Sequence, residues 1–187
     1  MKFFKNFYLN LKYRKIKFNF LGKGVEYKQK HSKFLYSQNI SIGNYSKILD
    51  YAFFDGIGEI EIGECTIIAP YCTIITSNHN YDETKINLLP FDNTLIMKKV
   101  SIGNYCWIGR NVMIMAGVKI GDGVIVAAGS VVTKSVDEFC IIGGNPAKII
   151  KLRDKEKILK LMSHKKCWNN KKINKSNKKI YLRQNNE

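Results

Sequence analysis

Large apolar residues, nearly all Ile or Val, recur at every sixth position along most of this chain. Four residues after each of these positions the side chain is small or β-branched, and the one exception is Asn78. The apolar positions form three runs: Ile42, Ile48, Phe54; Ile62, Ile68, Ile74; and Ile102, Ile108, Ile114, Ile120, Val126, Val132.

Neither a helix, with a period of 3.6 residues, nor a strand, with a period of two, explains a period of six. A coil built from three flat faces of about six residues explains it, because each face points one apolar side chain inward and a small residue fits near each corner. Stacked turns of such a coil bury continuous ladders of Ile and Val. The pattern therefore predicts an all-β solenoid.

The period breaks between Ile74 and Ile102, which lie 28 positions apart, four more than a multiple of six. We expect residues 78–99 to be pushed out of the coil, and long loops inside compact repeats are usually functional or disordered. This loop is too apolar for a disordered tether, since it contains Tyr81, Leu88, Leu89, Phe91, Leu95 and Met97. We therefore expect it to fold over a neighbouring subunit and a substrate cleft.

Two segments of different character flank the solenoid predicted for residues 38–150. Residues 1–37 are expected to hold a basic N-terminal helix and an entry strand, because Ile16, Phe18 and Phe20 alternate with polar residues. Residues 151–187 are expected to hold an α-helix capped by Asp154 and then a basic tail. Near the N-terminus four apolar residues stand at helical spacing: Phe3, Phe4, Phe7 and Leu11. A helix with this apolar side either packs on a neighbouring coil or subunit or acts as an interfacial membrane anchor.

The formal net charge of +16 is concentrated at the two ends of the chain. Residues 1–33 carry +9, residues 34–150 carry −3 and residues 151–187 carry +10. A nucleic-acid-binding protein usually carries its basic patch on the folded domain, so we expect no nucleic-acid partner. Basic ends around a mildly acidic core suit either a solvated surface or attraction to an anionic membrane face or a polyanionic substrate.

Cysteine usage and hydropathy indicate a cytoplasmic protein, with the inner face of the membrane as an option. No stretch of 18 apolar residues is present, and the N-terminus has no small-residue cleavage site of a signal peptide. The five cysteines include no CxxC pair, and Cys72 and Cys106 occupy small-residue positions of the repeat. We therefore expect reduced thiols and neither a disulfide framework nor a zinc site.

Three stretches carry a resemblance to a known family: "IGECTIIAPYCTIITSNH", "IGNYCWIGRNVMIMAGVKIGDGVIVAAGSVVTKSV" and "IIGGNPAKIIKLR". Over residues 38–153 the chain resembles the hexapeptide-repeat acyltransferases, in particular the galactoside, maltose, xenobiotic and polysaccharide O-acetyltransferases. The resemblance implies a left-handed parallel β-helix with an extruded active-site loop and a C-terminal α-helix. It also implies acetyl-CoA as co-substrate, no metal, and a homotrimer whose active sites lie between subunits.

His79 is the candidate catalytic residue. Of the three histidines, it alone stands within the repeats, at the mouth of the loop, while His31 and His164 lie outside them. The "NH" that follows "TS" also matches the catalytic position of the resembled family. An alcohol is a poor nucleophile toward a thioester, and a neutral imidazole is suited to take its proton near neutral pH. We expect direct attack on the thioester, with backbone N–H groups facing the carbonyl oxygen.

The resemblance also implies the residues that contact the two substrates. On the coenzyme A side they are Trp107, Arg110, Ala128, Thr133, Lys134, Lys148 and Lys151. Trp107 has an alternative role as a bulky side chain between subunits, and Arg110 departs from the small residue that the family often has. On the acceptor side they are Asp50, Asp55 and Tyr81. Tyr81, together with Asp82, has the alternative role of loop surface.

These observations favour an acetyl-CoA-dependent O-acetyltransferase that acts on a sugar hydroxyl, of a surface polysaccharide or its precursor. N-acylation of a nucleotide-linked amino sugar and acetylation of an antibiotic remain as alternatives, because those relatives share the coil. A hydratase of the γ-carbonic anhydrase type needs three metal-binding histidines, and only His79 lies on the predicted coil. A membrane-associated scaffold without catalysis is the non-enzymatic alternative.

Overall fold

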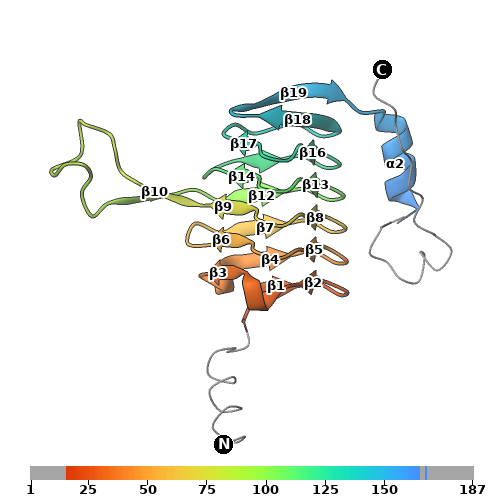
Figure 1. The fold of residues 1–187 in the computed structure, drawn as a ribbon, viewed down its shortest axis with the longest axis horizontal. Helices are drawn as coiled ribbons and strands as arrows, with labels where there is room; N and C mark the ends of the chain where they lie inside the picture. The colour runs from red at the N-terminus through yellow and green to blue at the C-terminus, as the bar shows by residue number, and fades with distance from the viewer. Residues whose placement is uncertain (1–15, 165–166, 168–187) are drawn as a thin grey trace, which may run out of the picture.

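The computed structural model describes residues 16–164 and Cys167, which form a parallel β-solenoid with a helix beside it (Figure 1). Three sheets, here named A, B and C, run along the solenoid. The A sheet contains β1 (Phe20–Leu21), β4 (Ile40–Ile42), β7 (Ile60–Ile62), β12 (Val100–Ile102) and β15 (Lys119–Ile120). The C sheet contains β3 (Lys33–Leu35), β6 (Phe53–Asp55), β9 (Thr73–Ile75), β14 (Met113–Ile114) and β17 (Val131–Val132).

The B sheet is the longest of the three, and it alone ends in an antiparallel pair. Its parallel strands are β2 (Glu26–Tyr27), β5 (Lys47–Ile48), β8 (Ile67–Ile68), β13 (Trp107–Ile108), β16 (Ile125–Val126) and β18 (Cys140–Gly144). The last strand, β19 (Ala147–Leu152), turns back along β18 and closes the C-terminal end of the core. Two short 3₁₀ turns, η1 (Gln29–His31) and η2 (Ser37–Asn39), lie in the N-terminal coils.

The predicted ladder residues all point into the core. Ile62, Ile102 and Ile120 are in register across the A sheet, and the same holds for the ladders of the other two sheets. Each of the six ladder residues between 102 and 132 is at most 2% exposed. No helix interrupts residues 100–136. The solenoid predicted from the period of six is therefore confirmed.

Small side chains near the corners link successive coils through hydrogen bonds. The Ser46 hydroxyl donates to the Gly63 carbonyl (2.7 Å) and accepts from the Thr66 N–H (3.0 Å). One coil later, the Thr66 hydroxyl donates to the Gly103 carbonyl (2.8 Å) and accepts from the Cys106 N–H (3.0 Å). These buried groups need partners, and a small polar side chain at the corner provides them.

The coils extend further toward the N-terminus than residue 38. β1, β2 and β3 pair with β4, β5 and β6, which adds one turn. Edge-to-face contacts of Phe18 with Tyr27 and Phe34, with ring centroids 5.3 and 5.4 Å apart, cover the open end of the core. Phe18 therefore caps the coil, as the alternating pattern suggested. The predicted N-terminal helix and basic tail lie outside the described residues.

The C-terminal helix begins where the sequence predicted. The Asp154 side chain accepts a hydrogen bond from the Lys157 N–H (2.9 Å) and so caps α2 (Lys155–Ser163). Just before the helix, the Arg153 guanidinium donates to the Gly123 carbonyl. This contact fixes α2 beside the solenoid, where Figure 1 shows it.

One expectation about the cysteines is wrong. Cys65 and Cys167 form a disulfide, with Cα atoms 5.5 Å apart, so these two thiols are not reduced. Cys65 lies at a corner of the coil with φ of 56° and is only half-buried, in contrast to the core thiols. Its partner, Cys167, stands 102 residues later in the chain. Spacing along the sequence carries no signal for such a distant pair.

No helix in the described part of the chain is long and apolar enough to cross a membrane. Residues 16–164 and Cys167 also contain no group of three or more His, Cys, Asp or Glu side chains that could hold a metal ion.

Candidate active site

A β-hairpin projects from the solenoid at the predicted break in the repeat. β10 (Ser77–His79) pairs antiparallel with β11 (Leu95–Met97), and the hairpin leaves the C sheet after β9 and returns to the A sheet at β12. Figure 1 shows this hairpin and its loop reaching away from the coils. The loop carries exposed apolar side chains, among them Leu88, Leu89 and Met97. It therefore presents an uncovered apolar surface within a single chain.

His79 is exposed on this hairpin, opposite Leu95. Its ring stacks on Phe91, with centroids 3.7 Å apart and planes 20° apart. Neither ring nitrogen makes a hydrogen bond to another residue between 16 and 164. Phe91 thus fixes the plane of the imidazole, and no described residue occupies either ring nitrogen. That is the arrangement required of a base that takes a proton from a substrate.

The base of the hairpin is held by Asp55. Its carboxylate accepts hydrogen bonds from the Ser77 hydroxyl (2.8 Å) and from the Ile57 N–H (3.3 Å). Thr76 adds a second link, because its hydroxyl donates to the Asp55 carbonyl (2.6 Å) and accepts from the Gly58 N–H (2.8 Å). Asp55 was expected to bind the acceptor. In the structure Asp55 is the last residue of β6, and its carboxylate binds Ser77, two residues before His79 in β10, so it supports the strand that carries the imidazole.

A pocket of about 260 Å³ lies between the hairpin and the last coils. It brings together Tyr81, predicted for the acceptor, and Thr133, predicted for coenzyme A. Sequence reasoning missed the other polar residues of its wall, Ser77, Asn78 and Lys98. Asn78 was visible in the sequence as the one corner residue that is neither small nor β-branched.

Two of the three acidic residues of the loop, Asp82 and Asp92, are engaged by local contacts. The Asp82 carboxylate accepts from the Lys85 ammonium (2.7 Å) and the Thr84 hydroxyl (2.6 Å), and these bonds lower its pKa to about 2. The pKa of Asp92 is lowered as well, by hydrogen bonds from Thr94 first and by the nearby charge of His79 last. Asp82 thus shapes the loop and does not contact His79.

Asp50 and Arg110 lie at a different edge of the solenoid, between the B and C sheets. Asp50 pairs with the Nδ1 of His31 (3.3 Å). Arg110 lies over the ring of Tyr71, 5.3 Å from its centroid, and Tyr71 stacks on Tyr51 at 4.6 Å. Within one chain, neither residue is brought to the hairpin.

The other residues predicted to hold coenzyme A line the outside of the last coils. Trp107 is 55% exposed on the outer face of the B sheet, in register with Ile67 and Ile125. Ala128 is exposed in the turn between β16 and β17, and a side chain added at the neighbouring Gly129 would meet no atom within 4 Å. Basic side chains that could face phosphates follow toward the C-terminus, all exposed: Lys134, Lys148 and Lys151. This surface fits a long, partly anionic ligand.

The cysteines are unsuited to act as nucleophiles. Burial raises the pKa of Cys72 to about 11 and that of Cys106 to about 12. Each thiol donates to a backbone carbonyl of the next coil, Gly109 and Gly121 respectively, at 3.1 Å. A buried thiol with a raised pKa supplies little thiolate, the reactive form.

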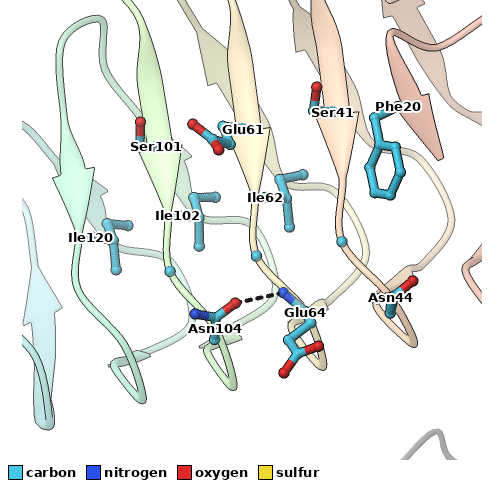
Figure 2. Close-up of a pocket in the computed structure, with 13 residues that line it drawn as sticks. Phe20, Ser41, Asn44, Glu61, Ile62, Glu64, Ser101, Ile102, Asn104 and Ile120 are labelled. Atoms are coloured by element: carbon cyan, nitrogen blue, oxygen red, sulfur yellow. Dashed lines mark hydrogen bonds between the residues drawn. The ribbon is translucent and has the colours of Figure 1, made fainter. Parts of the chain in front are cut away.

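A larger hollow, about 560 Å³, lies on the outer face of the A sheet (Figure 2). Figure 2 shows Ser41, Glu61 and Ser101 along this face, and the Glu64 N–H donates to the Asn104 side chain (2.8 Å) at its rim. Glu61 is paired with Lys99 at 2.8 Å. The hollow contains no histidine and none of the predicted site residues, so we place the candidate site at the hairpin.

Residues 99–134 match the family model described as bacterial transferase hexapeptide (six repeats). A relative from Escherichia coli (strain K12) is named as a lipopolysaccharide biosynthesis O-acetyl transferase. It is 36% identical to this chain over 121 residues, and the aligned region covers 62% of this chain and 59% of that protein. The chain spans 32% to 59% of the length of the first curated relatives that it matches.

Two solved structures share the fold. A maltose O-acetyltransferase from Clostridium difficile 630 superposes with a TM-score of 0.68 at 32% identity, over 76% of this chain and 73% of that chain. An N-acyltransferase mutant from Bacillus cereus, in complex with dTDP and coenzyme A, superposes with a TM-score of 0.66 at 26% identity, over 82% of this chain and 94% of that chain. The predicted left-handed parallel β-helix with a C-terminal helix is therefore confirmed.

Proposed function

We propose that this chain transfers an acetyl group from acetyl-CoA to a sugar hydroxyl. The chain belongs to the family of bacterial hexapeptide-repeat transferases, and the proposal builds on that membership. The observation that carries the proposal is the setting of His79, an exposed residue whose ring stacks on Phe91 and whose nitrogens are bound by no described residue. Acetyl-CoA supplies the activated acyl group as a thioester. The last coils supply small, open positions around Ala128 and exposed lysines for its phosphates.

In this mechanism His79 accepts the proton of the acceptor hydroxyl as the oxygen attacks the thioester carbonyl. A C–O bond forms, the C–S bond breaks, and coenzyme A leaves as the thiol after it takes up a proton. Asp55 and Ser77 hold the strand of His79 in place during the reaction. A positioned base of this kind contributes roughly 100- to 10,000-fold to the rate.

The distribution of side chains on the outer faces favours the trimer. The outer face of the A sheet is polar, with Ser41, Glu61, Ser101 and Lys119 in register. The outer face of the B sheet is apolar from β8 to β18, with Ile67, Trp107, Ile125 and Ile141 in register, whereas its N-terminal strands carry Lys47 and Glu26. The outer face of the C sheet carries Phe53, Thr73, Met113 and Val131.

A ring of three copies would place the B face of one subunit against the C face of the next and leave the polar A faces in solvent. The hairpin, which leaves the solenoid at the corner between the C and A faces, would then reach Trp107 and Arg110 of the neighbouring subunit. This arrangement accounts for the two groups of predicted site residues that a single chain keeps apart. Sedimentation should show a trimer, and a fully active monomer would contradict the assembly.

The acceptor we favour is a surface polysaccharide or its precursor, handled in the cytoplasm. The relative named for lipopolysaccharide biosynthesis supports this choice. The basic ends of the chain would attract an anionic membrane face, and this attraction should weaken as salt rises, because screening acts over about 10 Å at 0.1 M salt. Of those ends, residues 1–15, 165–166 and 168–187 lie outside the described residues.

N-acylation of a nucleotide-linked amino sugar is the second candidate. The N-acyltransferase from Bacillus cereus supports it, because the similarity covers 94% of that chain. Release of coenzyme A thiol should be measured with acetyl-CoA and a panel of simple sugars, lipid-linked glycans, nucleotide-linked amino sugars and chloramphenicol. Faster turnover with a sugar hydroxyl than with an amino sugar or the antibiotic supports O-acetylation. The reverse order overturns it.

A further inference from the structure

The pocket between the hairpin and the last coils contains one cation and no acid. Lys98 lies in its wall together with Asn78, Tyr81 and Thr133, and none of the residues that line it is Asp or Glu. The apolar part of the wall includes Ile96 and Met115. The pocket therefore combines a positive charge with neutral hydrogen-bonding groups.

Two glycines determine where Lys98 lies. The Lys98 N–H donates to the Thr76 carbonyl (2.8 Å). Gly58 makes room for this hydrogen bond, because a Cβ at Gly58 would lie 2.6 Å from the Thr76 carbonyl oxygen and 3.0 Å from the Lys98 nitrogen. On the other side, Gly117 has φ of +85°, and a Cβ there would lie 3.1 Å from the Lys98 Cδ. The methylene stem of Lys98 thus runs over Gly117, and its direction is set by packing.

The charge of Lys98 is not neutralised within the described part of the chain. Its neighbour Lys99 points to the A sheet, where its ammonium lies 2.8 Å from Glu61 and 3.8 Å from Glu59. No carboxylate of a described residue lies within 4 Å of the Lys98 ammonium. The loop carboxylates Asp82 and Asp92 are engaged by Lys85 and by Thr94.

We propose that this pocket binds an anionic group of the acceptor, a carboxylate or a phosphate, with the Lys98 ammonium as its counter-charge. A lysine acts on either group as a point charge, and the Asn78 amide and the Tyr81 hydroxyl, on the acceptor side of the pocket, are available as further donors. The substrate class is then an acidic or phosphorylated sugar. This inference rests on the proposed acetyl transfer, and it adds the charge of the acceptor.

The proposed base does not line the pocket, but it lies on β10, the strand that contributes Ser77 and Asn78 to the pocket wall. Asn78 and His79 are consecutive in β10, so their side chains point to opposite faces of the hairpin. β10 is the edge strand of a two-stranded sheet, which leaves its outer side unpaired by any described strand. In the proposed binding mode, a sugar held at Lys98 by its anionic group extends past this edge and presents a hydroxyl to His79.

The test compares two sugars of similar size, D-glucuronate and D-glucose, in equilibrium binding to the full-length protein. Lys98→Met keeps the stem over Gly117 and removes the charge, Lys98→Arg keeps the charge, and Lys119→Met is the control on the polar A face. Lys98→Met should weaken glucuronate binding about tenfold or more, which is typical for the loss of a charged hydrogen bond. Glucose binding should not change, and the other two variants should bind glucuronate nearly as the parent does.

The same variants separate the possible sources of the anion. Inorganic phosphate should be tested as a competitor of glucuronate binding. Competition in the parent protein that is lost in Lys98→Met supports an anion site that accepts phosphate as well as carboxylate. If Lys98→Met instead raises the KM for acetyl-CoA and leaves acceptor binding unchanged, Lys98 serves the donor phosphates and the inference is overturned. Glucuronate that binds no better than glucose to the parent also overturns it. Lys98-dependent binding without acetyl transfer to any acceptor would support the anion site and refute the proposed function.

Discussion

Replacement of Asp55 by alanine should loosen the hairpin that carries His79. The Ser77 hydroxyl donates to the half-buried Asp55 carboxylate at 2.8 Å, and this is a hydrogen bond to a charged acceptor. Such a bond contributes about 1.5–3 kcal/mol, so its loss should make opening of the hairpin base roughly 10- to 100-fold more frequent. The turnover number should fall with it, because His79 lies two residues beyond Ser77.

Amide hydrogen exchange, together with steady-state kinetics, measures both effects. The reporters are the N–H groups of Lys98 and Asn80, which donate to the carbonyls of Thr76 (2.8 Å) and Thr94 (3.0 Å). Ser77→Ala is the matched control, since it removes the same hydrogen bond from the other side. The two substitutions should be strongly non-additive in a double-mutant cycle.

The outcome distinguishes the two roles of Asp55. A positioning residue lowers the turnover number and raises exchange in the hairpin, with little change in the KM for the acceptor. A residue that binds the acceptor raises that KM and leaves exchange at the parental rate. The second pattern would refute the assignment made from the hydrogen bond to Ser77 and restore the expectation drawn from the sequence.

Three further predictions concern the core and the disulfide. Ile108→Ala should cost about 2–5 kcal/mol of unfolding free energy in urea titrations, because Ile108 is fully buried, whereas Lys119→Ala on the polar face should cost less than about 0.5 kcal/mol. Burial raises the pKa of Cys72 to about 11, so the folded state favours the neutral thiol and stability should fall as pH rises from about 9 to 11. Denaturation without reductant should expose three reactive thiols of the five, and a count of five would contradict the disulfide.

The sequence carried enough information for the solenoid because each ladder position follows from a local period. Ile108 is buried for the same reason as Ile102 and Ile114, and the regular spacing makes all three visible at once. The extruded loop was also visible, as a break in that period, but its antiparallel pairing of β10 with β11 was not. The antiparallel return of β19 along β18 was not visible, because it depends on a turn and not on the repeat.

The candidate site was only partly accessible to sequence reasoning. His79 stood out by its place at the break, but its stacking on Phe91 depends on the path of the loop, which no period describes. Lys98 was missed because the features that place it, the bare backbones of Gly58 and Gly117, come from other coils. Contacts that join distant segments, such as that between Cys65 and Cys167, likewise appear only in the folded chain.

The measurement that tests the account most directly is the turnover number of His79→Ala with acetyl-CoA and the preferred sugar acceptor. His164→Ala, at the exposed end of α2, is the matched control. We predict that His79→Ala keeps its fold and its KM for acetyl-CoA and loses roughly 100- to 10,000-fold in turnover, while His164→Ala turns over as the parent does. A His79→Ala protein that acetylates the acceptor at close to the parental rate would contradict the proposed role of His79 as the base.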